Sequence, residues 1–339
     1  MRLMAHSPRS GAVLVFSLVF FFLVSSLLGG CSDDSTEPVL DSGTASDTGP
    51  VADGGGDGAV PDASAPDATP PDGSRPVTLG HASFVPAGLT PEAATRLVIL
   101  GDSISAGVGA SGSAKVYHAL LGLNDDAAYP AEAATDLESL TGSPVEVVDV
   151  AVSGARTRNL ESQMTALRSS LTLPASGHTV VVVTIGGNDL SGAITGGDPT
   201  GGVLTAALRN IRMMVEFFQN PGNFPDGVSV YIGSVYDPSD GEAQIATCFF
   251  GLSLPELVAA MDVWRDEYEA LGAEMGFAVV DMLGAFHGHA HHYDNAMNPY
   301  YDSADPTPWF ADCLHPNDRG HHELRRIFYE AMDSSYSAD

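Results

Sequence analysis

Hydrophobic side chains follow two different spacings between residues 95 and 333, and the two alternate along the chain. Five short and almost continuous apolar runs, typical of strands buried on both faces of a parallel sheet, occur at 96–100, 145–150, 180–185, 228–235 and 277–282. Apolar residues at helical spacing occupy 130–140, 158–170, 204–219, 254–275 and 317–332. This alternation predicts an α/β fold: a three-layer α/β/α sandwich around a five-stranded, mostly parallel, doubly wound sheet of flavodoxin-like type.

The first 30 residues have the pattern of an export signal. Two arginines precede an uncharged apolar run at 12–28, and Cys31 follows two glycines. Small residues before a cysteine at this place resemble the bacterial lipoprotein signal, in which the cysteine is lipidated. We therefore expect a signal peptide at 1–30 and a lipid on Cys31, with Ser32 typical of outer-membrane sorting in Gram-negative cells. An uncleaved membrane anchor and an ordinary secretory signal are the alternatives, and all three place the rest of the chain outside the cytoplasm.

Residues 31–79 differ in composition from the rest of the chain. They are mostly Asp, Gly, Pro, Ala, Ser and Thr, with almost no large apolar side chains. Such a segment cannot bury enough apolar area to offset the entropy lost on ordering, so it is predicted to be a disordered linker. Weak calcium binding by its aspartates is an alternative, although no EF-hand loop pattern occurs. Residues 80–339 remain as the folded domain.

The chain is strongly acidic, with 43 acidic and 14 lysine or arginine residues and a formal charge of −29. Residues 80–339 alone carry −22. A surface this negative repels phosphate backbones, which argues against a nucleic-acid partner, and an anionic bilayer surface is also a poor electrostatic partner. We expect a monomer that meets the membrane only through its N-terminal lipid.

Residues able to do chemistry follow three of the predicted strands and precede the last predicted helix. In chain order, the four strings are Gly101-Asp102-Ser103-Ile104-Ser105, Val152-Ser153-Gly154, Gly186-Gly187-Asn188-Asp189 and Asp312-Cys313-Leu314-His315. Each string alone also fits a structural role, as a helix cap or a turn glycine. In the last string one loop can place the carboxylate on the imidazole Nδ1–H, while Nε2 takes a proton from a serine.

The four strings together, in this order, resemble the SGNH (GDSL) hydrolase superfamily of esterases, lipases and carbohydrate deacylases over about residues 95–333. The resemblance implies that Ser103 is the nucleophile, that His315 is the general base and then the general acid, and that Asp312 orients His315. It also implies an oxyanion hole made by the N–H groups of Ser103 and Gly154 and by the Asn188 side chain. The second string departs from the common pattern, because Asp149 stands near where many members carry an asparagine.

The resemblance implies hydrolysis of a carboxylic ester through an acyl-enzyme, without a metal or an organic cofactor. A small ester, a lipid or an acylated glycan is the expected substrate. Activity is predicted to rise as His315 loses its proton, which gives a neutral to alkaline optimum. A carbohydrate O-deacetylase is the alternative within enzymes, and a surface lipoprotein that binds without catalysis is the alternative outside them.

Four further features bear on the site. Cys248 and Cys313 remain once Cys31 is set aside, and outside the cytoplasm we expect them to form a disulfide, with two free thiols as the alternative. A histidine cluster (His287, His289, His291 and His292) has no accompanying ligand spacing, so we expect a loop beside the crevice rather than the alternative metal site. The Gly-x-Gly-x-x-Gly pattern at 107–112 starts too far beyond the strand for nucleotide binding and is predicted to be a loop. Aromatic residues at 293–310 fit either a substrate pocket or a small satellite core.

Overall fold

A five-stranded sheet forms the centre of the structure, a computed structural model that describes residues 82–193, 197–245, 247–248 and 251–333. The strands are β1 (Ala94–Gly101), β2 (Glu146–Asp149), β3 (His178–Thr184), β4 (Val228–Gly233) and β5 (Ala278–Val280). They lie in the order β2-β1-β3-β4-β5, and every neighbouring pair is parallel. The predicted doubly wound, flavodoxin-like sheet is confirmed, and it is parallel throughout its five strands.

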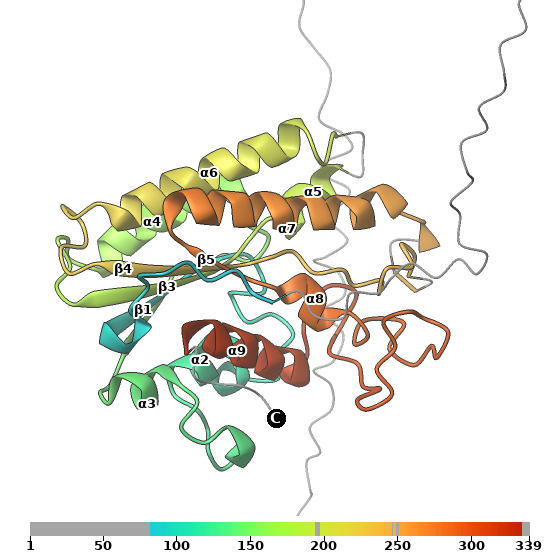
Figure 1. Ribbon diagram of the computed structural model, residues 1–339, viewed down its shortest axis with the longest axis horizontal. Helices are drawn as coiled ribbons and strands as arrows, with labels where there is room; N and C mark the ends of the chain where they lie inside the picture. Colours follow the sequence, from blue (N-terminus) through green and yellow to red (C-terminus); the bar gives the residue numbers. More distant parts are fainter. Residues whose placement is uncertain (1–81, 194–196, 246, 249–250, 334–339) are drawn as a thin grey trace, which may run out of the picture. The chain divides into compact units, whose positions relative to one another are not determined.

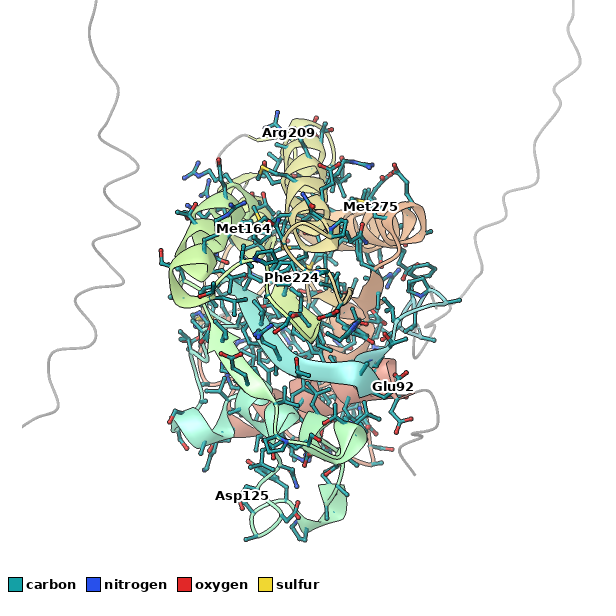
Figure 2. The ribbon with its side chains drawn as sticks, turned by 90° about the vertical axis from the view of Figure 1, so that its left-hand side faces the viewer. Glu92, Asp125, Met164, Arg209, Phe224 and Met275 are labelled. Carbon is teal, nitrogen blue, oxygen red and sulfur yellow. A yellow bond between two sulfur atoms is a disulfide. The ribbon has the colours of Figure 1, made fainter. Side chains whose placement is uncertain are left out.

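Helices cover the two faces of the sheet (Figure 1). One face carries α4 (Leu160–Ser170), α5 (Gly187–Ala193), α6 (Gly202–Gln219) and α7 (Pro255–Met275). The other carries α2 (Tyr117–Gly122), α3 (Leu137–Thr141) and α9 (Asp318–Met332), while α8 (Met282–Phe286) follows β5 at the end of the sheet. In Figure 2, Met164 and Met275 lie on the first side and Asp125 on the second.

The strand pattern explains how both faces are buried. Successive side chains of a strand point to opposite faces, so one strand contributes to two cores. In β1, Val98 and Leu100 pack with α4, α6 and α7, whereas Leu97 and Ile99 pack with α2, α3 and α9. All four side chains are fully buried. Because β1 lies in the middle layer and is covered on both faces, these four successive residues must all be apolar.

Two local expectations were wrong. The helix expected at 130–140 is a short 3₁₀ turn (Pro130–Glu132) followed by α3, because Ala134 has a φ of +64° and the Asp136 side chain accepts the Ser139 N–H at the start of α3. β2 was expected to be buried, but it is an edge strand, and Val147 is 44 % exposed. The short helices α2, α5 and α8 were not expected from the sequence.

The N-terminal predictions concern residues that the structure does not describe. The signal peptide at 1–30, Cys31 and the linker at 31–79 lie outside the described residues. Among the described residues, no helix combines the length and the apolar character needed to span a bilayer.

Candidate active site

The turn after β1 holds Ser103 close to β3. Gly101 has a φ of +129°, and a Cβ there would lie 2.2 Å from the Thr184 carbonyl oxygen, so the turn accepts only glycine. The Asp102 N–H donates to the same carbonyl at 3.0 Å, and the Asp102 carboxylate accepts the Ile104 N–H at 3.1 Å. Ser103 thus sits in the middle of a closed turn at the boundary of β1 and β3. In a sheet of this strand order, that boundary is the switch point where ligands bind.

Ser103, His315 and Asp312 form one hydrogen-bonded line. His315 Nε2 lies 2.9 Å from Ser103 Oγ, although 212 residues separate the two in the chain. On the other side of the ring, His315 Nδ1 lies 2.8 Å from Asp312 Oδ2 and 3.0 Å from Oδ1. With the proton on Nδ1 donated to Asp312, the Ser103 hydroxyl donates to Nε2. The structure therefore brings the three predicted residues together in the predicted order.

The loop that carries Asp312 and His315, residues 311–317, is held mainly through its backbone. The Tyr236 hydroxyl donates to the Leu314 carbonyl, and His291 Nε2 donates to the Asp312 carbonyl at 3.1 Å. The Ala311 N–H donates to the His315 carbonyl at 2.8 Å, which closes the loop on itself. The Asp312 carboxylate also accepts the Leu314 and His315 N–H groups at 2.8 Å, so the loop holds it against the His315 ring, and the ring in turn contacts Ser103.

Two of the three predicted oxyanion donors, Gly154 and Asn188, belong to segments that hydrogen bonds tie together. Asn188, at the start of α5, donates one amide N–H to the Ala155 carbonyl at 2.9 Å, directly beside Gly154. The next residue, Asp189, accepts the Thr157 N–H at 2.9 Å and its hydroxyl at 2.8 Å. Within the described residues, the N–H groups of Ser103 and Gly154 donate to no protein acceptor. Gly154 has a φ of +78° and is exposed, so its N–H stays open to a ligand.

The Cys248–Cys313 pair is a disulfide, with the two Cα atoms 5.8 Å apart. This confirms the sequence prediction. Cys313 is the residue after Asp312, so the bond attaches the 311–317 loop to the segment that follows β4.

The sequence matches the GDSL-like Lipase/Acylhydrolase family over residues 99–323, which is well over half of the chain. The chain belongs to this family. It is therefore a member of the SGNH (GDSL) hydrolase superfamily and an ester hydrolase, as the four strings predicted. No curated protein sequence matches the chain.

Several solved structures are similar to this GDSL-family chain. An extracellular lipase from Streptomyces rimosus is 22 % identical over 70 % of this chain and all of its own, with a TM-score of 0.43. An acetyl xylan esterase variant from Geobacillus stearothermophilus is 17 % identical over 73 % and 100 %, with a TM-score of 0.47. A phospholipase A1 from Streptomyces albidoflavus is 22 % identical over 70 % and 100 %, with a TM-score of 0.41.

The pKa values of two carboxyl groups in the GDSL-family site are shifted in opposite directions. For Asp312, partial burial would raise the pKa, but hydrogen bonds from the His315 ring and from the Leu314 and His315 N–H groups outweigh it and lower the pKa to about 2. For Asp102, burial dominates and raises the pKa to about 7, against the lowering effect of hydrogen bonds from Ile104 and Thr184 and of the nearby His315. Asp312 is thus anionic at neutral pH, while Asp102 sits near its midpoint.

Four further residues shape the GDSL-family site, and of these the sequence had pointed only to His291, as part of the histidine cluster. Gln163 of α4 accepts the Gly101 N–H at 2.8 Å and donates to the Gly101 carbonyl at 2.7 Å, which clamps the end of β1. Thr184 binds Asp102, and Tyr236 and His291 hold the 311–317 loop. Gln163 could have been found, because its helical spacing from Leu160 and Leu167 places an amide on the apolar face of the expected helix, where it needs a buried partner.

The histidine cluster faces acids and carbonyls rather than a common centre. His287 and His289 lie 3.9 Å and 4.0 Å from carboxylate oxygens of Asp237 and Asp302, and His292 lies 3.5 Å from Glu242. Among the described residues, no three His, Cys, Asp or Glu side chains are grouped to hold a metal ion.

The glycine-rich segment at 107–112 is a loop that packs on the 311–317 loop. A Cβ on Gly109 would lie 2.1 Å from the Pro316 carbonyl oxygen. The Ser111 N–H and Lys115 Nζ each lie 2.7 Å from the Asp318 carboxylate at the start of α9. The segment at 107–112 therefore links the serine turn to the 311–317 loop and to the start of α9.

Aromatic residues of 293–310 pack on the histidine cluster and on Tyr236 and Phe286. Trp309 is 4 % exposed and stacks on His289 with ring centroids 3.7 Å apart. Phe310 packs edge-on against Tyr236, and Tyr300 stacks on His287. Of the two sequence interpretations, these contacts favour the satellite core.

Proposed function

We propose that this protein hydrolyses carboxylic esters through an acyl-enzyme on Ser103. The observation that carries the proposal is the line from Ser103 Oγ to His315 Nε2 at 2.9 Å and from His315 Nδ1 to Asp312 Oδ2 at 2.8 Å. Both distances lie within the range needed for direct proton transfer and for orientation of the base.

In the acylation step, Ser103 Oγ bonds to the ester carbonyl carbon while its proton passes to His315 Nε2. Asp312 keeps the ring in the tautomer with Nδ1 protonated and stabilises the imidazolium that forms. The tetrahedral intermediate then breaks its bond to the alcohol oxygen, which takes the proton from Nε2 and leaves. Water repeats the sequence on the acyl-enzyme: it gives a proton to Nε2, attacks the acyl carbon, and releases the carboxylic acid and free Ser103.

In both steps negative charge develops on the former carbonyl oxygen, and preorganised N–H donors that stabilise this charge lower the activation free energy. The open N–H groups of Ser103 and Gly154 and the second amide N–H of Asn188 are the proposed donors. Asn188 donates one of its two amide N–H groups to the Ala155 carbonyl, and this bond fixes the direction of the other N–H.

The test is hydrolysis of p-nitrophenyl acetate and butyrate by the full-length chain and by Ser103→Ala. We expect turnover by the wild type and its loss in Ser103→Ala. Ser162→Ala, which removes a serine hydroxyl on an exposed part of α4, is the matched control and should behave as wild type. If wild type and Ser103→Ala are equally inert and Ser103 resists a fluorophosphonate label, the protein is a binding lipoprotein instead.

The acyl group is addressed by the same assay. A rate that falls steadily from acetate to longer p-nitrophenyl esters, together with acetate release from acetylated polysaccharide, would identify a carbohydrate O-deacetylase. A rate that rises with chain length would identify a lipase-like esterase.

We also propose that the domain is exported and anchored in the cell envelope by a lipid on Cys31, on the strength of the apolar run at 12–28 and the small residues before the cysteine. Growth with a radiolabelled fatty acid should label the wild type and leave Cys31→Ala unlabelled. Equal labelling, or none in either, would contradict the lipid anchor.

A further inference from the structure

A chain of four buried polar side chains lies behind Ser103, and the proposed reaction does not use it. Tyr117 of α2 shares a hydrogen bond of 2.9 Å with Ser105 Oγ, which lies 2.7 Å from Thr184 Oγ1 at the end of β3. Thr184 Oγ1 then donates to Asp102 Oδ1 at 3.1 Å. None of the four residues is more than 3 % exposed. The chain thus joins a helix, a strand and the serine turn inside the protein.

The number of hydroxyl protons fixes which group donates and which accepts in each of these hydrogen bonds. Each hydroxyl has a single proton to donate. Thr184 gives its proton to Asp102, so Ser105 must donate to Thr184, and Tyr117 must donate to Ser105. The second lone pair of Ser105 Oγ accepts the Thr184 N–H at 3.2 Å. In the reverse direction the Tyr117 proton would need an acceptor outside the chain, and the described residues around it offer none beyond Ser105 and Thr184.

The direction is stable over the working range of pH. Burial raises the pKa of the Tyr117 hydroxyl well above its ordinary value, so Tyr117 keeps the proton it donates. Asp102 accepts through Oδ1, which can receive a hydrogen bond whether the carboxyl is ionised or protonated on Oδ2. The charged or titratable groups that act on Asp102 are His315 from the 311–317 loop, Tyr117 from α2, Tyr236 after β4 and Tyr268 of α7.

The last member of this hydrogen-bonded series, Asp102, is the residue that closes the serine turn. Asp102 Oδ1 accepts both the Thr184 hydroxyl and the Ile104 N–H, so the carboxyl links the residues before and after Ser103 to β3. We propose that Thr184, Ser105 and Tyr117 are positioning residues, whose directed hydrogen bonds hold the Asp102 carboxyl and thereby keep Ser103 Oγ within reach of His315. This inference rests on the proposed role of Ser103 as nucleophile.

The test separates hydrogen bonding from packing at Thr184. Thr184→Val keeps the shape and loses the hydroxyl, whereas Thr184→Ser loses a methyl group and keeps the hydroxyl. We expect Thr184→Val to lower kcat and the rate of fluorophosphonate labelling of Ser103 by about 10- to 100-fold, with KM changed by less than about threefold. Thr184→Ser should stay within about threefold of wild type in all three quantities.

Tyr117→Phe tests the far end of the chain, with Tyr231→Phe as the matched control. Tyr231 is also fully buried, but it lies in β4 and takes no part in the hydrogen-bonded series from Tyr117 to Asp102. Tyr117→Phe should slow labelling by about three- to tenfold, because Ser105 loses a donor, and Tyr231→Phe should label at the wild-type rate. Melting temperatures of all variants show that each is folded.

Two outcomes would overturn the positioning role: Thr184→Val as fast as Thr184→Ser, or Tyr117→Phe no slower than Tyr231→Phe. If Thr184→Val does not fold, the comparison of Tyr117→Phe with Tyr231→Phe decides alone. Full activity in Ser103→Ala is a different failure, since it removes the proposed nucleophile and this inference with it.

Discussion

Cys313 is bonded to Cys248, and it stands directly after Asp312 in the chain. The cross-link therefore enters the loop between the residue proposed to orient the base and the base itself, His315. A hydrogen bond from Tyr236 to the Leu314 carbonyl holds the next residue. The loop is thus restrained covalently at one residue and by a hydroxyl at the one after it.

Removal of this disulfide should cost both stability and rate. The bond closes a loop over a separation of 65 residues, for which chain entropy alone predicts a loss of about 4 kcal/mol in unfolding free energy. In Cys248→Ser/Cys313→Ser we expect a lower melting temperature and a lower kcat at 25 °C, because Asp312 and His315 gain freedom. Unchanged values of both would contradict a role of the disulfide in the site.

Asp312→Asn should lower kcat by about 10³- to 10⁴-fold, because an amide favours the wrong tautomer of His315 and cannot stabilise its cation. Asp294→Asn, an exposed acid in the connection before the 311–317 loop, is the control and should keep wild-type activity. The pKa of Asp312 is lowered to about 2, so loss of activity between pH 7 and pH 4 should not follow protonation of this residue. Equal activity of the two variants would remove Asp312 from the mechanism.

Asn188→Ala should lower kcat by about 10²- to 10³-fold with little change in KM, since the donor acts on charge that develops only in the transition state. Asn188→Asp keeps the shape but replaces a donor by an anion, and it should be at least as slow. An effect confined to KM would place Asn188 in substrate binding instead.

Gly101→Ala should disrupt the serine turn. A Cβ there would lie 2.2 Å from the Thr184 carbonyl oxygen, and the backbone has a φ of +129°. We expect a loss on the order of 1–3 kcal/mol or more in unfolding free energy and most of the activity. Gly112→Ala is the matched control in the adjoining loop, where the backbone is extended and a Cβ meets nothing within 4 Å. Similar behaviour of the two variants would contradict this account of the turn.

Asp102 should make the protein less stable as pH rises. Its pKa is raised from the ordinary 3.8 to about 7 in the folded state, so its contribution is complete below pH 4 and is lost as pH rises to 7. Relative to Asp102→Asn, the wild type should lose up to about 4 kcal/mol of unfolding free energy between pH 4 and pH 8. Urea unfolding at several pH values measures this difference.

Asp312→Asn supplies the opposite sign in the same urea experiments. The folded-state pKa of Asp312 is lowered, so its contribution is present above pH 4 and is lost as pH falls toward 2. A difference between wild type and Asp102→Asn that did not vary with pH would contradict the raised pKa of Asp102.

Local sequence was enough to predict the sheet and the groups gathered at its end. A strand of the middle layer must be apolar on both faces, so β1 and β3 are visible as continuous runs. The carboxyl ends of parallel strands meet at one edge, so Ser103 and Asn188, each just after a strand, had to lie near each other. The disulfide prediction rested on the expected export of the domain and on the presence of only two cysteines after Cys31.

Tertiary structure decided the partners of these residues. Gln163 meets Gly101 across 62 positions, and Thr184 meets Asp102 across 82, so neither contact leaves a local pattern in the sequence. The first contact depends on the docking of α4, and the second depends on the register of β1 against β3. The break in the helix expected at 130–140 has the same origin, because Asp136 binds the N–H of Asn124 as well as that of Ser139. Periodicity reports which face of an element is buried, whereas the atom that each buried polar group meets is set by how the elements pack.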